Sequence, residues 1–362
     1  MRINGIQRQT IWLDEDGWSV NIIDQTKLPH QFEIINLTTM EAAAQAIKDM
    51  WVRGAPLIGA TAAYGLCLAL RKDPSNQAMN EAISFLNAQR PTAVNLRWAL
   101  ETMKAHIENK PEAERLQIAY AKAAKIVADD SETNRLIGVH GAALIKQLAA
   151  KKQGAPVNVL THCNAGWLAT TEWGTATSPI YHAHREGIPV HVWVDETRPR
   201  NQGASLTAYE LLHEDIPSTL IVDNAGGHLM QHGQVDLCIV GTDRTAANGD
   251  VANKIGTYLK ALAAHDNNIP FYVALPTSTI DWTLTSGFDI PIEERSGEEV
   301  LKMAGADAEG RVTDIALTAP NVKAANPAFD VTPAKYVTGL ITELGIVPAT
   351  TAGLQSIQEK AA

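Results

Sequence analysis

Cysteine is scarce in this chain of 362 residues, which has three cysteines, Cys67, Cys163 and Cys238, and no CxxC pair. A sparse, odd set of cysteines does not make a disulfide framework, so a reducing compartment, the cytoplasm, is expected. The first residues lack the apolar run of a signal peptide. The longest apolar run, 56–70, falls short of the ~20 residues of a membrane helix and predicts a buried helix instead, so no membrane partner is expected.

Positive charge is also in deficit, since the formal net charge is −10. Affinity for nucleic acids comes mainly from clustered Lys and Arg, so an acidic chain is not expected to bind them. A small phosphorylated ligand is still compatible with this charge, because it needs only a local pocket of cations or backbone N–H groups. The proportions of hydrophobic (45%) and charged (19%) residues are typical of a folded globular protein.

Several common motifs are missing as well. The chain has no GxGxxG, GxxxxGK(S/T) or GxSxG pattern, which removes the usual reasons to expect a dinucleotide-dependent dehydrogenase, a nucleotide hydrolase or an α/β-hydrolase. His182 and His184 do not have the i and i+4 spacing of two ligands on one helical face. No metal site is therefore expected.

The hydrophobic pattern changes near residue 152. Before it, short β-like pieces at 10–13 and 32–35 precede helical periodicity, which starts at Thr39 and again at Pro56 and continues near 76–88, 93–108, 112–128 and 132–151. After it, helical stretches (166–186, 204–213, 224–232 and 252–266) alternate with short apolar runs typical of buried parallel strands, at 157–160, 190–194, 219–222, 237–240 and 271–275. A closing helix is predicted over 337–344.

This alternation predicts an α/β fold in two domains. The first, residues 1–152, is expected to be mainly helical with a small β element. The second, residues 153–362, is expected to be a Rossmann-like domain with a doubly wound parallel sheet. In such sheets ligands bind beyond the carboxyl ends of the strands, so the loops at those ends are the candidate sites.

The loop after 157–160 is Thr161-His-Cys-Asn-Ala-Gly166. Cys163 is predicted to stand just before a helix N-terminus, where backbone N–H groups favour a thiolate. The alternative is that Cys163 is a small buried residue, the commonest fate of a free cysteine. Cys67 and Cys238 lie within apolar runs, and for them burial is the expectation.

The loop after 190–194 carries Arg198, Arg200 and Gln202 ahead of a predicted helix. Arginine and amide side chains beside a helix N-terminus suit an anion or a sugar. The alternative is an exposed loop in which the arginines pair with Asp195 and Glu196.

The segment 241–254 follows the apolar run 237–240 directly. Asp243 stands three residues beyond Val240, where it would serve as an acid or base, or would cap the next segment or pair with Arg244. Asn253 and Lys254 are predicted to begin a helix and to bind phosphate, the alternative for Lys254 being a solvated charge.

Two further loops lie in the helical part, Arg53-Gly54-Ala55-Pro56 and Arg90–Asn95. Each contains an arginine and runs into a predicted helix, with Pro56 at a favourable first-turn position. A plain helix cap explains both equally well.

Taken together and in order, six segments of the chain resemble the methylthioribose-1-phosphate isomerase family, which acts in methionine salvage. They span about residue 50 to 300 and are Arg53–Gly59, Arg90–Leu96, Thr161–Gly166, Glu196–Ala204, Gly241–Asp250 with Asn253–Lys254, and Pro276–Asp281 followed by Ile292–Arg295. The wider superfamily contains regulatory subunits of a translation-initiation exchange factor and ribose-1,5-bisphosphate isomerase.

The resemblance implies a set of site residues. Cys163 and Asp243 would be catalytic, and the substrate-binding set would be Arg53, Gly54, Ala55, Arg90, Gln202, Asn253 and Lys254. It also implies a small sugar phosphate as substrate, a homodimer, and a reaction that needs neither cofactor nor metal.

The reaction of this family poses a chemical problem. A sugar 1-phosphate has its anomeric oxygen blocked, so ring opening needs an acid at the ring oxygen, and Asp243 is the candidate because it follows a buried run. Cys163 would then act in hydrogen transfer from C2 to C1, by proton transfer or beside a hydride shift.

Alternative activities stay open at this point. One is isomerisation of a related sugar 1-phosphate, such as 5-deoxyribose 1-phosphate or ribose 1,5-bisphosphate, and another is a non-catalytic regulatory subunit. Trp167 and Trp173 near the Cys163 loop favour an apolar pocket for a methylthio group, although both also suit a core.

Overall fold

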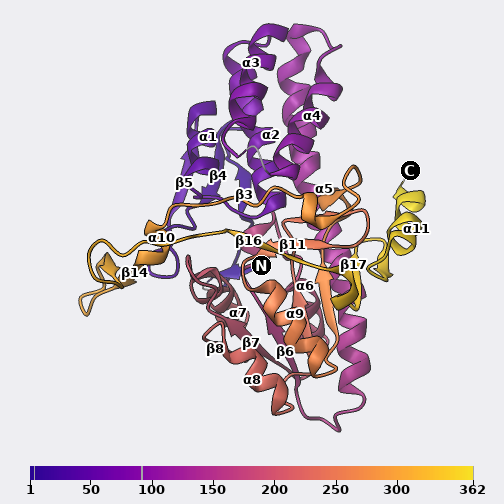
Figure 1. Cartoon of the computed structure of the whole chain (residues 1–362). Helices are drawn as coiled ribbons and strands as arrows, with labels where there is room; N and C mark the ends of the chain where they lie inside the picture. The colour runs from indigo at the N-terminus through magenta and orange to yellow at the C-terminus, as the bar shows by residue number, and fades with distance from the viewer. Residues whose placement is uncertain (4, 91–92, 362) are drawn as a thin grey trace.

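The computed structural model describes residues 1–3, 5–90 and 93–361, and its helices and strands are arranged in two parts (Figure 1). The N-terminal part holds a three-stranded antiparallel sheet, β3 (Ile11–Leu13), β4 (Val20–Ile23) and β5 (Ile34–Leu37). Beside it stand the helices α1 (Met40–Lys48), α2 (Ala55–Lys72), α3 (Asn76–Asn87) and α4 (Val94–Ile107). The predicted small β element and helices are confirmed.

The helix α2 is the centre of this part. It is apolar on nearly every side and contacts α1, α3, α4 and α5, as expected of a helix buried in a core. Pro56 lies in its first turn, where a missing N–H costs no intrahelical hydrogen bond.

The next helix, α5 (Glu112–Ala149), is continuous where the sequence predicted two. Asp130, at the expected break, is buried and accepts hydrogen bonds from Thr171 N–H and Oγ1 at 2.9 and 2.8 Å. A distant loop therefore satisfies the polar residue, and the helix does not end. Because α5 contributes to two hydrophobic clusters, the domain boundary at 152/153 stays a prediction.

The C-terminal part is built on a seven-stranded sheet in the order β18-β17-β12-β9-β6-β7-β8. All neighbouring pairs are parallel except β17 with β18. The strands are β6 (Val157–Thr161), β7 (Val190–Asp195), β8 (Ser218–Ile221), β9 (Leu237–Val240), β12 (Phe271–Ala274), β17 (Gly339–Thr342) and β18 (Gly345–Val347).

Counted along the chain, the six parallel strands lie in the order 3-2-1-4-5-6, which is the Rossmann order. Helices cover both faces of the sheet. On one face α5, α6 (Ser178–Arg185) and α7 (Ala208–His213) share a hydrophobic cluster with the strands, and on the other α8 (Ala225–Gln231), α9 (Thr257–Asp266) and α11 (Thr351–Ala361) do. The predicted Rossmann-like sheet is confirmed, and its strand order reverses between β6 and β9.

Three predicted helices are partly or wholly wrong. Of the predicted helix 166–186, only a short 3-10 turn at Trp167–Ala169 and α6 are helical. Residues 252–256 belong to a second sheet, β13-β10-β11-β16, or to the turn after it, and α9 begins only at Thr257. The strands of this sheet are β10 (Arg244–Ala246), β11 (Val251–Lys254), β13 (Ile280–Asp281) and β16 (Phe329–Thr332). The segment 337–344 forms β17 and its turn, because it fills the position beside β12 in the main sheet.

The remaining elements are small. Two-stranded sheets form from β1 (Arg2–Ile3) with β2 (Ile6–Gln7) and from β14 (Lys302–Ala306) with β15 (Val312–Ala316), the latter preceded by α10 (Glu298–Leu301). In Figure 1 this β14–β15 hairpin projects from the side of the molecule. No helix among the described residues has the length and apolarity needed to cross a membrane.

Candidate active site

Cys163 and Asp243 follow the two strands between which the strand order reverses. Cys163 comes two residues after β6, and Asp243 comes three residues after β9. In open α/β sheets this reversal opens a crevice at the carboxyl ends of the strands, where ligands bind. The Asp243 N–H donates to the Ala252 carbonyl at 3.0 Å, so the segment 241–254 folds back on itself and carries Asp243 beside β11.

The Cys163 backbone is held in an unusual conformation. Its φ is +68°, its N–H donates to Thr197 Oγ1 at 2.9 Å, and its carbonyl accepts from Thr207 Oγ1 at 2.8 Å. The prediction that Cys163 stands just before a helix N-terminus is wrong: the nearest helical turn is the 3-10 turn η1 (Trp167–Ala169). Tertiary hydrogen bonds across the sheet edge, rather than a helix dipole, fix this thiol.

Cys67 and Cys238 lie in the hydrophobic clusters. Burial raises the pKa of both thiols far above the ordinary value, so neither is a competing nucleophile. The expectation that both are buried is confirmed.

The guanidinium of Arg53 faces the Cys163 loop from the N-terminal part. Its Nη2 lies 4.0 Å from Cys163 Sγ and donates to the Asn164 carbonyl at 2.9 Å, and its Nη1 donates to Asn164 Oδ1 at 2.6 Å. Gly54 makes this approach feasible: its φ is +91°, and a Cβ there would come within 2.3 Å of the Ala169 carbonyl oxygen. Ala55 opens α2, whose first-turn N–H groups have no acceptor inside the helix.

Lys254 lies at the end of β11 rather than at a helix start, which corrects the prediction for Asn253 and Lys254. Lys254 is buried, donates to the Ala328 carbonyl at 2.9 Å and lies 4.5 Å from the centre of the Phe329 ring. Burial lowers the pKa of Lys254 to about 8; the nearby Cys163 and Asp243 oppose this shift, and Arg295 and Arg53 add to it. The Lys254 ammonium therefore interacts electrostatically with both predicted catalytic groups, Cys163 and Asp243.

Arg90 belongs to the same group of charges. Burial and the neighbouring Arg295 lower its pKa below the usual value, while Glu293 and Asp243 oppose the shift. Its guanidinium lies 3.8 Å from Glu293. Pro91 and Thr92, which follow it in the predicted Arg90–Asn95 loop, lie outside the described residues.

Four cations thus converge on Cys163 and Asp243 in a protein of net charge −10. They are Arg53, Arg90, Lys254 and Arg295. Arg295 is not among the site residues predicted from the sequence, although it ends one of the six matching segments. A cluster of cations, of which Lys254 is buried and the three arginines are partly buried, suits a phosphate-bearing ligand.

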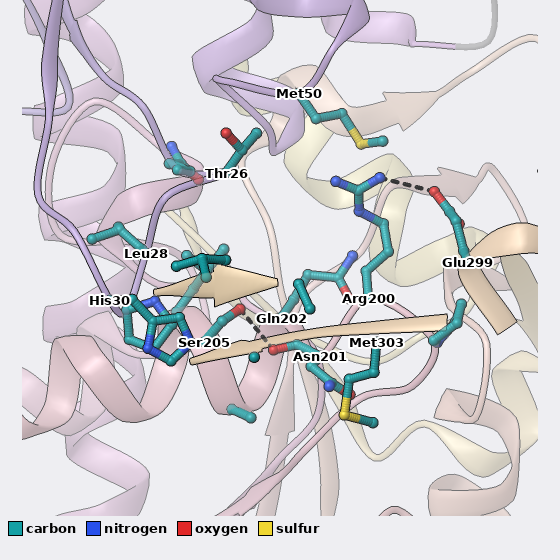
Figure 2. A pocket seen from close by; sticks show the side chains of 18 of the residues that line it. Thr26, Leu28, His30, Met50, Arg200, Asn201, Gln202, Ser205, Glu299 and Met303 are labelled. Carbon is teal, nitrogen blue, oxygen red and sulfur yellow. Dashed lines mark hydrogen bonds and ion pairs between the residues drawn. The ribbon is translucent and has the colours of Figure 1, made fainter. Parts of the chain in front are cut away.

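A cavity of about 700 Å³ adjoins this cluster, and Figure 2 shows it from close by. Arg53 and Gln202 line it, whereas Cys163 and Asp243 do not. Arg53 therefore touches both the cavity and, at 4.0 Å, the Cys163 thiol. Gln202 Oε1 is buried and accepts no hydrogen bond from the described residues. An unpaired buried acceptor beside a cavity is free to bind a ligand.

Among the described residues, the arginines of the Gln202 loop form no ion pair within 4.0 Å with Asp195 or Glu196. Arg200 forms an ion pair of 2.8 Å with Glu299, visible in Figure 2, and Arg198 donates to the Val300 carbonyl at 2.9 Å. Both therefore hold α10 and, through it, the hairpin that closes one side of the cavity.

Asp250 and the two tryptophans have structural surroundings. Asp250 accepts hydrogen bonds from Gly287 N–H at 3.0 Å and Ala334 N–H at 2.8 Å, so its side chain holds two neighbouring loops in place. Trp167 is fully buried in the core, and Trp173 stacks on His182. Neither lines the cavity, and Trp167 has the core position that was the alternative to a pocket wall.

Among the described residues, one group of side chains has the spacing of a metal site: His162, Asp195 and Asp223, with ligand atoms within 4.8 Å of one another. The Lys260 ammonium lies 3.1 Å from Asp195 Oδ2 and already supplies a cation to it. His162 uses both ring nitrogens, one with Asp195 and one with the Ile255 carbonyl, each at 2.8 Å. These contacts favour a structural ion cluster beneath the Cys163 loop.

Glu210, on α7, is a buried carboxylate that sequence reasoning did not single out. It accepts hydrogen bonds from the Asn164 side chain, Trp167 N–H, Leu168 N–H and the Tyr181 hydroxyl. Burial raises the pKa of Glu210 to about 7, although these four donors favour its charged form. Nothing local in the sequence marks it, because all four partners come from other elements.

The fold and this site define an α/β protein of Rossmann strand order with a thiol, a carboxyl group and four cations at the strand-order reversal. The model of the Initiation factor 2 subunit family matches residues 51–349. The methylthioribose-1-phosphate isomerase of Sinorhizobium medicae is 59% identical over 359 residues, which cover 99% of each chain. The chain belongs to the Initiation factor 2 subunit family and, within it, to the methylthioribose-1-phosphate isomerases.

Two solved structures are similar over almost the whole fold. The crystal structure of 5-methylthioribose 1-phosphate isomerase from Pyrococcus horikoshii aligns with a TM-score of 0.83 and 42% identity, covering 98% of this chain and 96% of that one. The translation initiation factor eIF-2B subunit delta from A. fulgidus aligns with a TM-score of 0.78 and 40% identity, covering 94% and 96%. The predicted family is confirmed.

Proposed function

We propose that this protein is an aldose–ketose isomerase that converts 5-methylthioribose 1-phosphate to 5-methylthioribulose 1-phosphate in methionine salvage. The observation that carries the proposal is the convergence of Cys163, Asp243 and four cations at the switch point of the sheet. The isomerase names of relatives that match nearly the full chain support the same reaction.

Asp243 is proposed as the acid that protonates the ring oxygen. The blocked anomeric oxygen of a sugar 1-phosphate prevents spontaneous ring opening, so a positioned proton donor lowers the barrier. Asp243 is only partly exposed and is fixed through its backbone beside β11. Once the ring is open, the aldehyde at C1 is available for isomerisation.

Cys163 is proposed to act in the hydrogen transfer from C2 to C1. As a thiolate it would remove the C2 proton and return it at C1 through an enediol. On the second route a hydride shifts between the carbons, and Cys163 handles the hydroxyl proton. The buried thiol and the nearby Arg53 and Lys254 cations are compatible with both routes.

The remaining residues are proposed to hold the substrate. Arg53, Arg90 and Lys254 supply positive charge for the phosphate, together with the first-turn N–H groups after Gly54 and Ala55. Gln202 offers its unpaired Oε1 to a sugar hydroxyl, and Asn253 supports the site from β11. Leu28, Met50, Leu206 and Met303 give the cavity apolar walls suited to a methylthio group.

The test is to incubate the purified protein with 5-methylthioribose 1-phosphate and to follow the ketone product by NMR. Parallel samples contain 5-deoxyribose 1-phosphate and ribose 1,5-bisphosphate. We expect the methylthio substrate to be turned over most efficiently. If none is turned over, a non-catalytic role replaces the proposal. In deuterated water, deuterium at C1 of the product indicates proton transfer, and its absence indicates a shielded or hydride path.

We also propose that the protein acts as a cytoplasmic homodimer. Three free cysteines suit a reducing compartment. Leu212, Leu220 and Val222 are exposed near β8, the edge strand of the main sheet. Apolar side chains along an open sheet edge favour association with a second chain.

A further inference from the structure

The carboxylate of Glu210 occupies the centre of the Cys163 loop although it does not line the cavity. It is fully buried. Oε1 accepts from Asn164 Nδ2 and Leu168 N–H, both at 2.9 Å, and Oε2 accepts from Trp167 N–H at 3.2 Å and the Tyr181 hydroxyl at 2.8 Å. A Cβ on Gly166 would lie 1.7 Å from Oε2, so the carboxylate rests directly against the loop backbone.

The Asn164 amide connects this carboxylate to Arg53. Its Nδ2 donates to Glu210 Oε1 and to Thr207 Oγ1, the latter at 3.2 Å, and its Oδ1 accepts from Arg53 Nη1 at 2.6 Å. Because Glu210 accepts from Nδ2, the amide cannot turn its NH₂ group toward the guanidinium. Arg53 is thereby held with Nη2 4.0 Å from Cys163 Sγ.

The same amide also steadies the backbone of Cys163. Thr207 Oγ1 accepts from Asn164 and donates to the Cys163 carbonyl at 2.8 Å. Glu210 and Thr207 follow the loop that carries Gln202, so one helical segment fixes both sides of the thiol. Buried networks in which every member is paired hold one geometry.

We propose that Glu210 is a positioning residue for the Arg53–Cys163 pair, acting through the side-chain amide of Asn164. Its hydrogen bonds go to other groups than the thiol and the guanidinium, so its role is indirect. What matters in this arrangement is the reach of its Oε1 to Asn164. The activity readout rests on the isomerase function proposed above, whereas a second readout does not.

Two variants separate the reach of the side chain from its charge. Glu210→Asp keeps the charge but withdraws the carboxylate by about 1.5 Å, the length of one C–C bond. Glu210→Gln keeps the reach and both bonds to Oε1. Its NH₂ group faces the Tyr181 hydroxyl, which then accepts instead of donating, and the 3.2 Å bond from Trp167 N–H is the one that is lost. Tyr181→Phe is the matched control, because it removes one bond to Glu210 on the side away from Asn164.

The first experiment measures kcat and KM of these variants with intact Arg53 and with Arg53→Lys, after circular dichroism has established folding. We expect Glu210→Asp to lower kcat/KM by about 10- to 100-fold, as loss of an orienting partner typically does. We expect kcat/KM of Glu210→Gln and of Tyr181→Phe to stay within about fivefold of the value for the unsubstituted protein. In the Arg53→Lys background, where Arg53 is already replaced, we expect Glu210→Asp to lower kcat/KM less than about threefold further. The proposal would be overturned if Glu210→Asp lowered kcat/KM by the same factor with Arg53 intact and with Arg53→Lys. It would also be overturned if Glu210→Gln lowered kcat/KM as much as Glu210→Asp does.

The second experiment measures the rate at which iodoacetamide alkylates Cys163, followed by peptide mass spectrometry. We expect Glu210→Asp to change this rate at least about fivefold, since the cation beside the thiol moves, and Tyr181→Phe to leave it unchanged. An unchanged rate in folded Glu210→Asp contradicts the positioning role. If the unsubstituted protein does not turn over the substrate, the proposed function fails and this alkylation rate still decides the role of Glu210.

Discussion

At the residue scale, charge compensation determines which groups are available for chemistry. The Lys254 ammonium is buried among Arg53, Arg295 and an aromatic ring, and its pKa is lowered to about 8. Cys163 and Asp243 oppose that shift, because negative charge on either group favours the protonated form of Lys254. A substrate phosphate would strengthen this compensation, because it adds negative charge among the cations.

This gives a pH prediction. In the free enzyme Lys254 loses its proton as pH rises through about 8, whereas the substrate phosphate is already fully ionised above its second pKa of about 6. We therefore expect kcat/KM to fall above about pH 8, since that ratio reports groups of the free enzyme. A pH profile of kcat/KM checks this.

The control for the pH profile is Lys254→Arg, which keeps its charge to higher pH. In this variant the alkaline decline should move upward, whatever the overall loss of activity. A decline at the same pH in both proteins would assign it to another group.

At the element scale, the site depends on glycines at which two segments of the chain lie too close together to leave room for a Cβ atom. Gly54 ends the loop that carries Arg53, and its backbone lies against η1 of the Cys163 loop. Gly166 and Glu210 meet in a similar way on the other side of that loop. The geometry of the thiol is therefore set by contacts between α2, η1 and α7.

Gly54→Ala tests this close approach. The added Cβ would meet the Ala169 backbone at 2.3 Å, and the φ of +91° is strained for alanine. We expect a loss of about 2 kcal/mol or more in the free energy of unfolding, together with lower activity. Thermal unfolding and kcat/KM measure the two effects.

Gly154→Ala is the matched control, since Gly154 has the same φ of +91° and no atom within 4 Å of a Cβ. Gly154→Ala introduces the strain of a positive φ without a steric clash, so we expect it to lower stability less than Gly54→Ala does and to leave activity unchanged. Equal losses in the two variants would show that the close approach at Gly54 contributes nothing.

The elements predictable from sequence were those with a strong local pattern. Short β-branched runs located β6, β7, β8, β9 and β12, and the loops after β6 and β9 led to Cys163 and Asp243. The strand β11 was missed because it depends on pairing with β16, from residues 329–332. Likewise α5 looked interrupted because the partner of Asp130 lies on a distant loop.

The supporting residues of the site were beyond sequence reasoning for the same reason. Glu210 lies on a helix with no local feature that marks a buried carboxylate, and its four partners are brought to it only by the fold. Arg295 stood within a recognisable segment, yet only the structure places its charge beside Arg90 and Lys254.

At the scale of the whole molecule, the site joins both halves of the chain. Arg53 and Arg90 come from the helical part, and Cys163, Asp243 and Lys254 come from the sheet part. α5 connects the two parts as one continuous helix that contributes to the hydrophobic cluster of each. A change at the junction is therefore expected to affect activity as well as stability.

The proposed homodimer is tested at this scale by sedimentation at micromolar concentration. We expect a dimer, and we expect Leu220→Asp to weaken it, because a charge on the exposed edge strand β8 opposes burial. Ile315→Asp, an exposed apolar position on β15, should leave it intact. A monomer, or dissociation by Ile315→Asp alone, would contradict the proposed edge interface.

The most direct measurement compares turnover of 5-methylthioribose 1-phosphate by the unsubstituted protein, Cys163→Ala and Asp243→Asn. We expect the unsubstituted protein to form the ketone and each variant, still folded, to lose about 10²- to 10⁴-fold in kcat, the range for a positioned acid or base. Near-normal kcat in either variant, or no ketone from the unsubstituted protein, would contradict the assignment of the thiol and carboxyl pair at the switch point.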